Sequence, residues 1–233
     1  MNVILVTHDS VYGRYFARKL SESTTIDKII FESGRPSRKF YWKKFKKVGP
    51  VNFIFQYFLN RWFEKEGRRA LPDLDKPSHI EVENVNYYDF TDDDLIIGFG
   101  SSFIFGKTLR RLKNGFLNLH TGLLPEYRGV KSEFWVLHNR DFENAGWTLH
   151  YMVTRLDAGD IVIRQKMAVT DENPAQLRAK ILKEAVPVIA EFIEQVRRNG
   201  ISSIERIPQG DGTYYTTPTR AEWKHYLKMA GKK

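Results

Sequence analysis

The segment DLIIGFGSSFIFGKTLRRLKNGFLNLH, residues 94–120, contains a strand, a helix and a second strand in succession. Residues 95–100 are an apolar run that ends in glycines, and residues 116–119 are a second apolar run. Both runs are typical of strands that are buried on two faces. Residues 106–112 between them are predicted to be helical. Two buried strands connected by a helix predict a parallel sheet and therefore an α/β fold.

The sequence on both sides of this segment continues the alternation of strand and helix. The predicted strands are residues 2–7, 26–31, 79–82, 146–154, 160–168 and 212–215, and the predicted helices are residues 11–20, 130–139, 173–198 and 220–228. We therefore expect an open, mostly parallel, Rossmann-like sheet with helices on both faces. Ligand sites of such sheets lie at the carboxyl ends of the strands, where His8, residues 98–102 and residues 118–120 fall.

The composition excludes several classes of site. The chain has 233 residues, which predicts one large domain or one domain with a small appendage. It has no cysteine, so disulfides, thiolate metal sites and cysteine nucleophiles are excluded. No His, Asp and Glu group has metal-ligand spacing, and we expect no metal. No apolar run reaches 18 residues and no signal sequence is visible, so we expect a cytoplasmic protein without a transmembrane segment.

The net charge of +9 comes from one part of the chain. Residues 35–69 carry eleven Lys or Arg and only two acids, Glu64 and Glu66, whereas the remainder of the chain is balanced. A local excess of this kind predicts a single basic patch rather than a general attraction for polyanions. The segment is predicted to be an insertion, about residues 35–70, of two helices broken at Gly49–Pro50.

The same insertion is rich in aromatic side chains: Phe40, Tyr41, Trp42, Phe45, Phe53, Phe55, Tyr57, Phe58 and Trp62. So many apolar rings are unusual for contact with a nucleic-acid backbone, and we expect no nucleic-acid partner. Three interpretations remain open. The helices pack together with a solvated basic face, they lie on a membrane surface as a peripheral contact, or their rings stack a base or form a homodimer interface.

Three polar residues suggest a catalytic site. Asn118 and His120 are separated by one residue at the end of a strand, so their side chains share one face. An amide and an imidazole placed in this way can hold a developing oxyanion. Asp157 follows the alternating segment 146–154, and a carboxylate beside the imidazole can steer protons. The alternatives are an Asx turn at Asn118, a surface histidine, and an aspartate that serves only turn geometry.

Two neighbouring features indicate ligand contacts. Arg128, in an otherwise apolar loop, can pair with a phosphate or carboxylate of a ligand. Residues 98–102 lack both the Lys-Ser/Thr of a P-loop and the Gly-x-Gly-x-x-Gly spacing, so nucleotide binding by either route is not indicated. Glycines at a strand end instead allow a flat ligand to lie against bare backbone.

Four linked motifs resemble those of the 10-formyltetrahydrofolate-dependent formyltransferases. They are Asn118-Leu-His120, Leu123-Leu-Pro125, Tyr127-Arg-Gly129 and Leu156-Asp157-Ala-Gly159, and the resemblance is strong over residues 95–168. It implies a catalytic triad of Asn118, His120 and Asp157, with 10-formyltetrahydrofolate as co-substrate. It also implies a pterin pocket formed by Gly100, Ser101, Ser102, Phe103, Val153, Thr154 and Asp157. One departure is Gly122, where the family usually has Ser.

The acceptor amine is less well defined by the motifs. Residues 1–200 are the expected catalytic domain, and residues 201–233 form a short C-terminal extension whose segment 214–220 resembles that of amino-sugar formyltransferases. The resemblance therefore implies a nucleotide-linked amino sugar as acceptor, with Thr121, Gly122, Arg128 and His8 as substrate-binding residues. One alternative acceptor is glycinamide ribonucleotide or another small amine. A non-catalytic basic protein that binds membrane or RNA is the other alternative.

Overall fold

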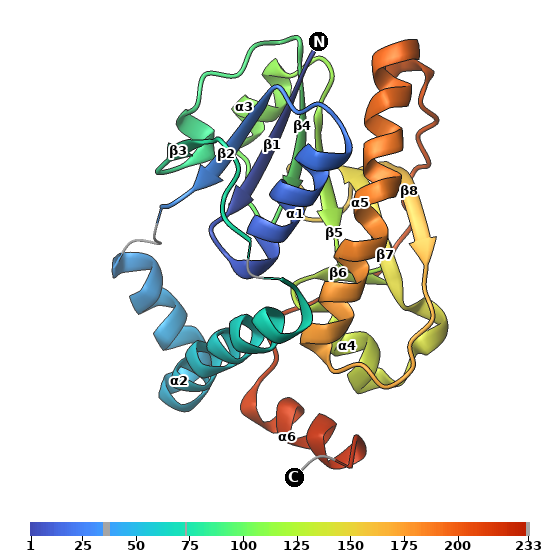
Figure 1. The fold of residues 1–233 in the computed structure, drawn as a ribbon. Helices are drawn as coiled ribbons and strands as arrows, with labels where there is room; N and C mark the ends of the chain where they lie inside the picture. Colours follow the sequence, from blue (N-terminus) through green and yellow to red (C-terminus); the bar gives the residue numbers. More distant parts are fainter. Residues whose placement is uncertain (35–37, 73, 232–233) are drawn as a thin grey trace.

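The computed structural model describes residues 1–34, 38–72 and 74–231, and its centre is a seven-stranded sheet (Figure 1). The strand order is β3-β2-β1-β4-β5-β7-β8. The first five strands are parallel, whereas β7 and β8 run antiparallel to their neighbours. The strand bounds are β1 Asn2–His8, β2 Lys28–Glu32, β3 Ile80–Val82, β4 Asp94–Phe99, β5 Phe116–His120, β7 Gly146–Tyr151 and β8 Ile161–Lys166.

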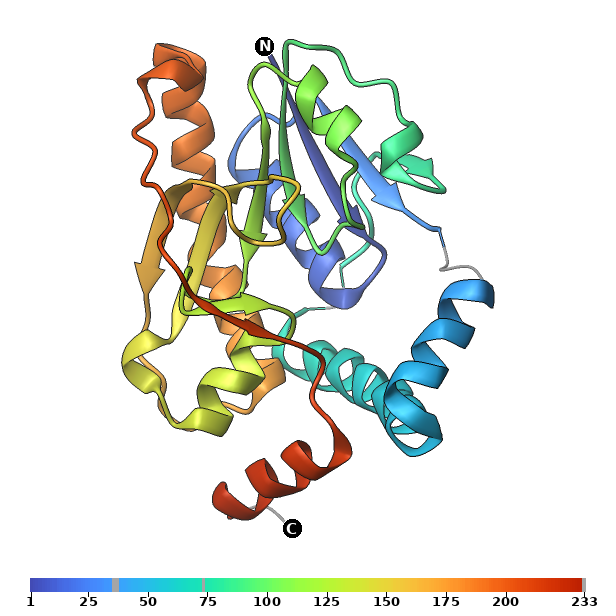
Figure 2. The same ribbon diagram turned by 180° about the vertical axis from the view of Figure 1, so that it is seen from behind.

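Helices cover both faces of this sheet, as predicted. The helix bounds are α1 Val11–Ser23, α2 Arg38–Ala70, α3 Gly106–Arg111, α4 Ser132–Asn139, α5 Pro174–Asn199 and α6 Arg220–Met229. α1 and α5 lie on one face and α3 on the other (Figures 1 and 2). Strand β1 shows why two layers form: Val3 and Leu5 belong to the larger core, whereas Ile4 and Val6 face the smaller one.

One short sheet was not predicted. Strand β6, Tyr127–Gly129, pairs in parallel with β9, Thr213–Tyr215. The sequence predicts the strand at residues 212–215, but residues 127–129 are too few to show a hydrophobic period and are predicted as loop. The helix predicted from residue 130 begins at Ser132 for the same reason. This pairing attaches the C-terminal segment directly behind the residues that follow β5.

Helix α2 has the predicted break. Gly49 has non-helical backbone angles, with φ 76° and ψ 162°, directly before Pro50. The two arms contact each other because Phe53 packs against Tyr41 and Phe45 at ring distances of 6.4 and 5.6 Å. The second arm is buried at Leu59 and Phe63, which pack against α5. Residues 35–37 of the predicted insertion lie outside the described residues.

The outward side of α2 is unusually apolar. Its exposed large side chains are Phe40, Tyr41, Trp42, Val51, Ile54, Tyr57 and Phe58. Basic residues lie among them; for example, Lys46 Nζ lies 5.3 Å from the centroid of the Trp42 ring. No helix in the described parts of the chain is both long enough and apolar enough to cross a bilayer.

The C-terminal segment packs firmly against the rest of the molecule. α6 starts with a capping box in which Thr219 and Glu222 satisfy each other's backbone donors. Trp223 stacks on Phe134 at 5.3 Å and meets Trp62 edge to face at 5.0 Å. The extension therefore joins α2 to α4 (Figure 1). The domain division near residue 200 stays a prediction.

Trp223→Ala is expected to lower the free energy of unfolding by about 2 kcal/mol, because the ring is partly buried between two other aromatic side chains. Urea denaturation followed by circular dichroism measures this. Phe58→Ala, on an exposed ring of α2, is the control and should change the free energy by less than about 0.5 kcal/mol. Equal effects of the two variants would contradict the packing role of Trp223.

Candidate active site

A cavity of about 410 Å³ opens at the carboxyl ends of β4 and β5. Its lining includes Gly100, Ser101, Ser102, Phe103, Asn118, His120, Thr121, Lys131, Asp157 and Arg178. Asn118 and His120 come from β5, whereas Asp157 comes from the turn after β7, far away in the sequence. Of the residues expected at the strand ends, residues 99–102 and 118–120 line this cavity, and Gly98 does not. His8 lies in a neighbouring cavity.

Asn118 is oriented by a histidine on the next strand. In the antiparallel pairing of β5 and β7, Asn118 lies directly opposite His150, and its Nδ2 is 3.3 Å from His150 Nε2. His150 Nδ1 donates to the carbonyl of Tyr151 at 3.0 Å, which leaves Nε2 as an acceptor. One amide proton of Asn118 is thus held by His150, and the other is free for a ligand.

His120 is fixed at one nitrogen and available at the other. Its Nε2 lies 2.6 Å from the carbonyl oxygen of Tyr127 and 3.0 Å from Ser132 Oγ. A contact of 2.6 Å to a carbonyl requires a proton on Nε2, because two lone pairs would repel each other. This arrangement leaves Nδ1 as the ring nitrogen available to a ligand, and Nδ1 lies 3.9 Å from Asp157 Oδ2.

Asp157 is buried and held by backbone groups. It has a φ of 48°, in the left-handed region, and Oδ2 accepts the N–H of Gly129 at 2.8 Å. Its other oxygen, Oδ1, is 3.6 Å from His150 Nε2. An aspartate in a surface turn does not need burial beside two imidazoles or a left-handed backbone. This geometry therefore favours a functional role for Asp157 over a role in turn geometry alone.

The expected ligand contact of Arg128 is corrected. The side chain is only 3% exposed, and its guanidinium donates to the backbone carbonyl of Asp157 at 3.1 Å. It also donates to Gln209 Oε1 and to the carbonyl of Gly210. Through these three bonds the guanidinium connects the C-terminal segment to the turn that contains Asp157. Arg128 therefore acts as a structural clamp and does not line the cavity.

Gly122 does not line the cavity. It is buried, and a Cβ atom added there would lie 2.5 Å from Ser132 Cβ and 2.9 Å from Ser132 Oγ. The space that a serine at position 122 would need is thus filled by Ser132. Ser132 Oγ donates to the Tyr127 carbonyl and accepts from His120 Nε2. The structure explains the departure at Gly122, since Ser132 supplies a hydroxyl there.

Thr121 lies at the cavity wall, but its hydroxyl is already bonded. It donates to Glu133 Oε2 at 2.9 Å, and Glu133 also pairs with Arg178. His8 Nδ1 donates to the backbone carbonyl of Glu32 at 2.8 Å, which leaves Nε2 near Glu32 Oε2 at 3.5 Å. Both residues stay candidates for substrate contact through their remaining surface.

The loop of residues 100–103 presents backbone and one unpaired hydroxyl to the cavity. The buried carboxylate of Glu32 accepts the N–H of Ser102 at 2.8 Å and so fixes the loop. Among the described residues, Ser101 Oγ is buried without a hydrogen-bond partner, and none of their atoms lies within 4 Å of a Cβ built on Gly100. An unpaired buried hydroxyl next to open backbone fits a polar, flat ligand.

Val153 and Thr154 are placed differently from the other predicted pocket residues. β7 ends at Tyr151, so both residues lie in the turn that follows and are exposed. The Thr154 methyl group lies against Gly106, and neither side chain lines the cavity. The predicted strand 146–154 was too long because the alternation of side chains continues into this turn.

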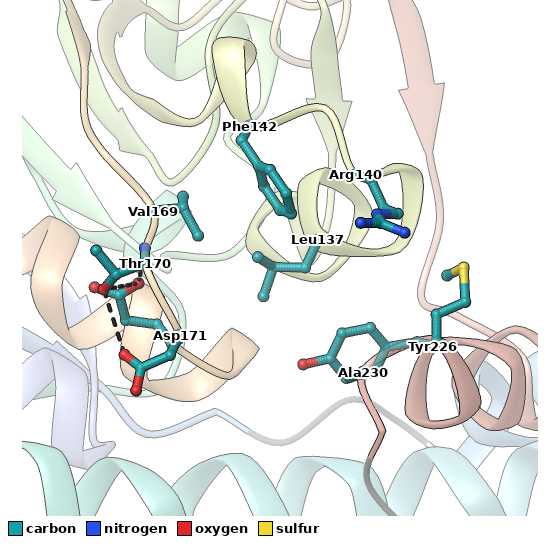
Figure 3. A pocket seen from close by; sticks show the side chains of 10 residues that line it. Leu137, Arg140, Phe142, Val169, Thr170, Asp171, Tyr226 and Ala230 are labelled. Atoms are coloured by element: carbon teal, nitrogen blue, oxygen red, sulfur yellow. Dashed lines mark hydrogen bonds between the residues drawn. The ribbon is translucent and has the colours of Figure 1, made fainter.

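Another cavity lies on the far side of α4 and has a volume of about 270 Å³ (Figure 3). Arg140 and Phe142 line one side, and Tyr226 of α6 lines the opposite side. Thr170 on its wall is hydrogen-bonded to the neighbouring acids. It contains none of the predicted site residues.

The sequence prediction missed three residues that support the site. His150 lies on the polar side of the alternating strand, but the sequence did not show which strand it would face. Ser132 and Glu133 start a short helix, and neither belongs to a motif. The contacts of all three depend on strand pairing and loop closure, which no local pattern contains.

Comparison with known proteins gives one family. The family model described as formyl transferase matches residues 35–193, more than half of the chain. A 4-N formyltransferase from Francisella tularensis superposes with a TM-score of 0.58 at 19% identity, covering 97% of this chain and 86% of that chain.

Two further structures contain ligands. An N-formyltransferase from Helicobacter canadensis, in complex with folinic acid and dTDP-3-aminofucose, has a TM-score of 0.59 at 15% identity and covers 95% of this chain and 72% of that one. A formyltransferase from Anoxybacillus kamchatkensis, in complex with UDP-4,6-dideoxy-4-formamido-L-AltNAc and tetrahydrofolate, has a TM-score of 0.53 at 17% identity and covers 97% and 90%. At these identities the likeness shows a shared fold.

His150 makes stability depend on pH. Burial, together with the nearby His120, lowers the pKa of His150 from its ordinary value of 6.5 to about 4. The unfolded chain therefore takes up a proton below about pH 6.5 that the folded chain refuses. Stability from this group is full above that pH, and on the order of 3 kcal/mol is lost as the pH falls to about 4.

We expect His150→Gln to remove this component, because glutamine does not titrate. The free energy of unfolding of the unchanged chain should fall more steeply between pH 7 and pH 4 than that of the variant. Denaturant titrations at four pH values measure both slopes. Parallel slopes would mean that the pKa of His150 does not differ between the folded and the unfolded chain.

Proposed function

Because the chain belongs to the formyl transferase family, we propose that it transfers a formyl group from 10-formyltetrahydrofolate to the amino group of a nucleotide-linked amino sugar. One observation carries the proposal. The amide of Asn118, the free nitrogen of His120 and the carboxylate of Asp157 border one cavity. This donor set suits acyl transfer through a tetrahedral oxyanion.

The proposed reaction has two steps. The acceptor amine attacks the formyl carbon, a new C–N bond forms, and the carbonyl electron pair moves to the oxygen. The free N–H of Asn118 and the Nδ1–H of protonated His120 donate to that oxyanion. Breaking the bond between the formyl carbon and N10 then restores the carbonyl and completes the transfer.

Asp157 has two roles in this scheme. Its carboxylate lies 3.9 Å from His120 Nδ1 and holds the imidazole in position beside the formyl oxygen. It also guides the proton that the amine loses toward N10, through a water molecule. The bond from Gly129 N and the clamp of Arg128 keep the carboxylate at this position during both roles.

The loop of residues 100–103 supports folate as the co-substrate. The unpaired hydroxyl of Ser101 and the open backbone at Gly100 offer polar contacts to a flat heterocycle. Two of the similar structures hold folinic acid or tetrahydrofolate. Gly100, Ser101, Ser102, Phe103 and Asp157 would form the pterin pocket, whereas Val153 and Thr154 would contribute only backbone.

The amino-sugar acceptor is supported by the ligands of the same structures, dTDP-3-aminofucose and a UDP-linked formamido sugar. His8 and Thr121 are proposed to contact it from the neighbouring wall. Glycinamide ribonucleotide is the second candidate acceptor, although the turn His8–Gly13 lacks the Gly-Ser-Asn sequence that this substrate's phosphate usually meets.

Incubating the purified protein with 10-formyltetrahydrofolate and a panel of UDP- and dTDP-linked amino sugars tests the proposal. We expect one panel member to gain a formyl group, measured by mass spectrometry, with release of tetrahydrofolate. Asn118→Ala should reduce this rate by about 10²- to 10³-fold, the usual cost of one oxyanion donor. A fully active Asn118→Ala variant, or formylation of glycinamide ribonucleotide alone, would contradict the assignment.

Ser132→Ala should lower kcat by about 10-fold and leave both KM values unchanged, because the imidazole loses one of two acceptors at Nε2. The exchange Gly122→Ser with Ser132→Gly returns a hydroxyl from the opposite side and should restore kcat. Steady-state kinetics of the single and exchanged variants decide this. No rescue by the exchange would show that Ser132 serves packing only.

A further inference from the structure

A second cavity, of about 240 Å³, lies beside the active site. Phe99, Gly100, Lys131 and Arg178 line both cavities. The second cavity is completed by the end of β1 and the start of α1, with His8, Ser10 and Tyr12, and by Asn60, Phe63 and Glu64 of α2. The positively charged residues at the junction have no role in the chemistry derived above.

Lys131 contacts an aromatic ring and no acid of the described residues. Its Nζ forms no hydrogen bond or ion pair within residues 1–34, 38–72 and 74–231, and it lies 3.7 Å from the centroid of the Phe63 ring. The residue is half-buried and has a φ of 62°, a left-handed conformation that lysine rarely adopts. A half-buried lysine that has a strained backbone and no counter-ion among the described residues indicates a ligand site.

Arg178 lies next to it and has unused donor capacity. Its guanidinium pairs with Glu133, but Nε is buried and has no hydrogen-bond partner. The guanidinium carbon is 4.9 Å from the centroid of the same Phe63 ring. Glu133 also accepts from Thr121, and Glu64 accepts the N–H of Val11 at 3.1 Å. Neither acid is therefore bonded to Lys131.

We propose that Lys131 and Arg178 bind the diphosphate of the acceptor, at the junction between the catalytic cavity and the α2 side of the molecule. The inference rests on the proposed function, since it places the amino sugar in the cavity of Asn118 and its diphosphate beside it. The ammonium group and the free N–H supply charge-assisted hydrogen bonds to phosphate oxygens. The nucleoside then lies in the second cavity, between Tyr12 and α2.

The alternative source of negative charge is the glutamyl carboxylate of the folate. The two sources are separated by measuring KM for each substrate. Lys131→Met should raise KM for the nucleotide sugar by about 10- to 100-fold, the effect of losing one charge-assisted bond. KM for 10-formyltetrahydrofolate should not change. Lys28→Met, an exposed lysine at the opposite end of the sheet, is the matched control.

The pH dependence gives an independent readout. Burial and then the charge of Arg178 lower the pKa of Lys131 to about 7, with Lys44 acting in the same direction and Glu133 and Glu64 opposing it. KM for the nucleotide sugar should therefore rise as the pH increases from 6 to 8, while Lys131 loses its proton. Lys131→Arg stays charged over this range and should abolish the rise.

Titration with UDP or dTDP alone, by calorimetry, tests the site without the reaction. We expect binding by the unchanged protein and by Lys28→Met, and weakened binding by Lys131→Met. If this pattern appears while no amino sugar is formylated, the phosphate site stands and the proposed function fails. If formyl transfer occurs but Lys131→Met changes neither KM nor diphosphate binding, the site is wrong and the function stands. If Lys131→Met raised only the KM for 10-formyltetrahydrofolate, the proposed diphosphate site would also be wrong.

Discussion

The antiparallel pairing of β5 with β7 is the constraint on which the candidate site depends. It sets Asn118 opposite His150 and His120 opposite Thr148. A shift of one residue would turn every side chain of β5 to the other face of the sheet. The turn that follows β7 carries Asp157, and it places the Asp157 carboxylate beside His120. Asn118 and His120 are thus positioned by the backbone hydrogen bonds of the sheet, whereas Asp157 is held by the N–H of Gly129 and by Arg128.

Buried polar groups around the triad are satisfied by protein partners, and this keeps the site rigid. Arg128 binds three acceptors, Glu133 binds Thr121 and Arg178, and His150 is neutral near pH 7. A polar group that is buried without a partner costs about 1–3 kcal/mol. The exceptions at Ser101 Oγ and Arg178 Nε therefore stand out. Both residues line the catalytic cavity, where a ligand can supply the missing bond.

The two faces of helix α2 differ in their surroundings. Its inner face supplies Asn60, Phe63 and Glu64 to the second cavity, whereas its outer face exposes aromatic and basic side chains. The positive excess of residues 35–69 disfavours contact between two copies through this outer face, because like charges would meet. It does not oppose an anionic ligand at the inner face.

The sequence alone determined the class of fold, the order of nearly all strands and helices, the break at Gly49 and the three triad candidates. Hydrophobic periodicity and linked motifs are local, so a single sequence contains them. The tertiary structure decided which side chains meet. It made Arg128 a clamp instead of a ligand contact and put Ser132 in the space beside Gly122. It also brought Lys131, which precedes α4, next to Arg178 of α5. These contacts follow from strand register and loop closure between distant segments, which no local pattern of residues specifies.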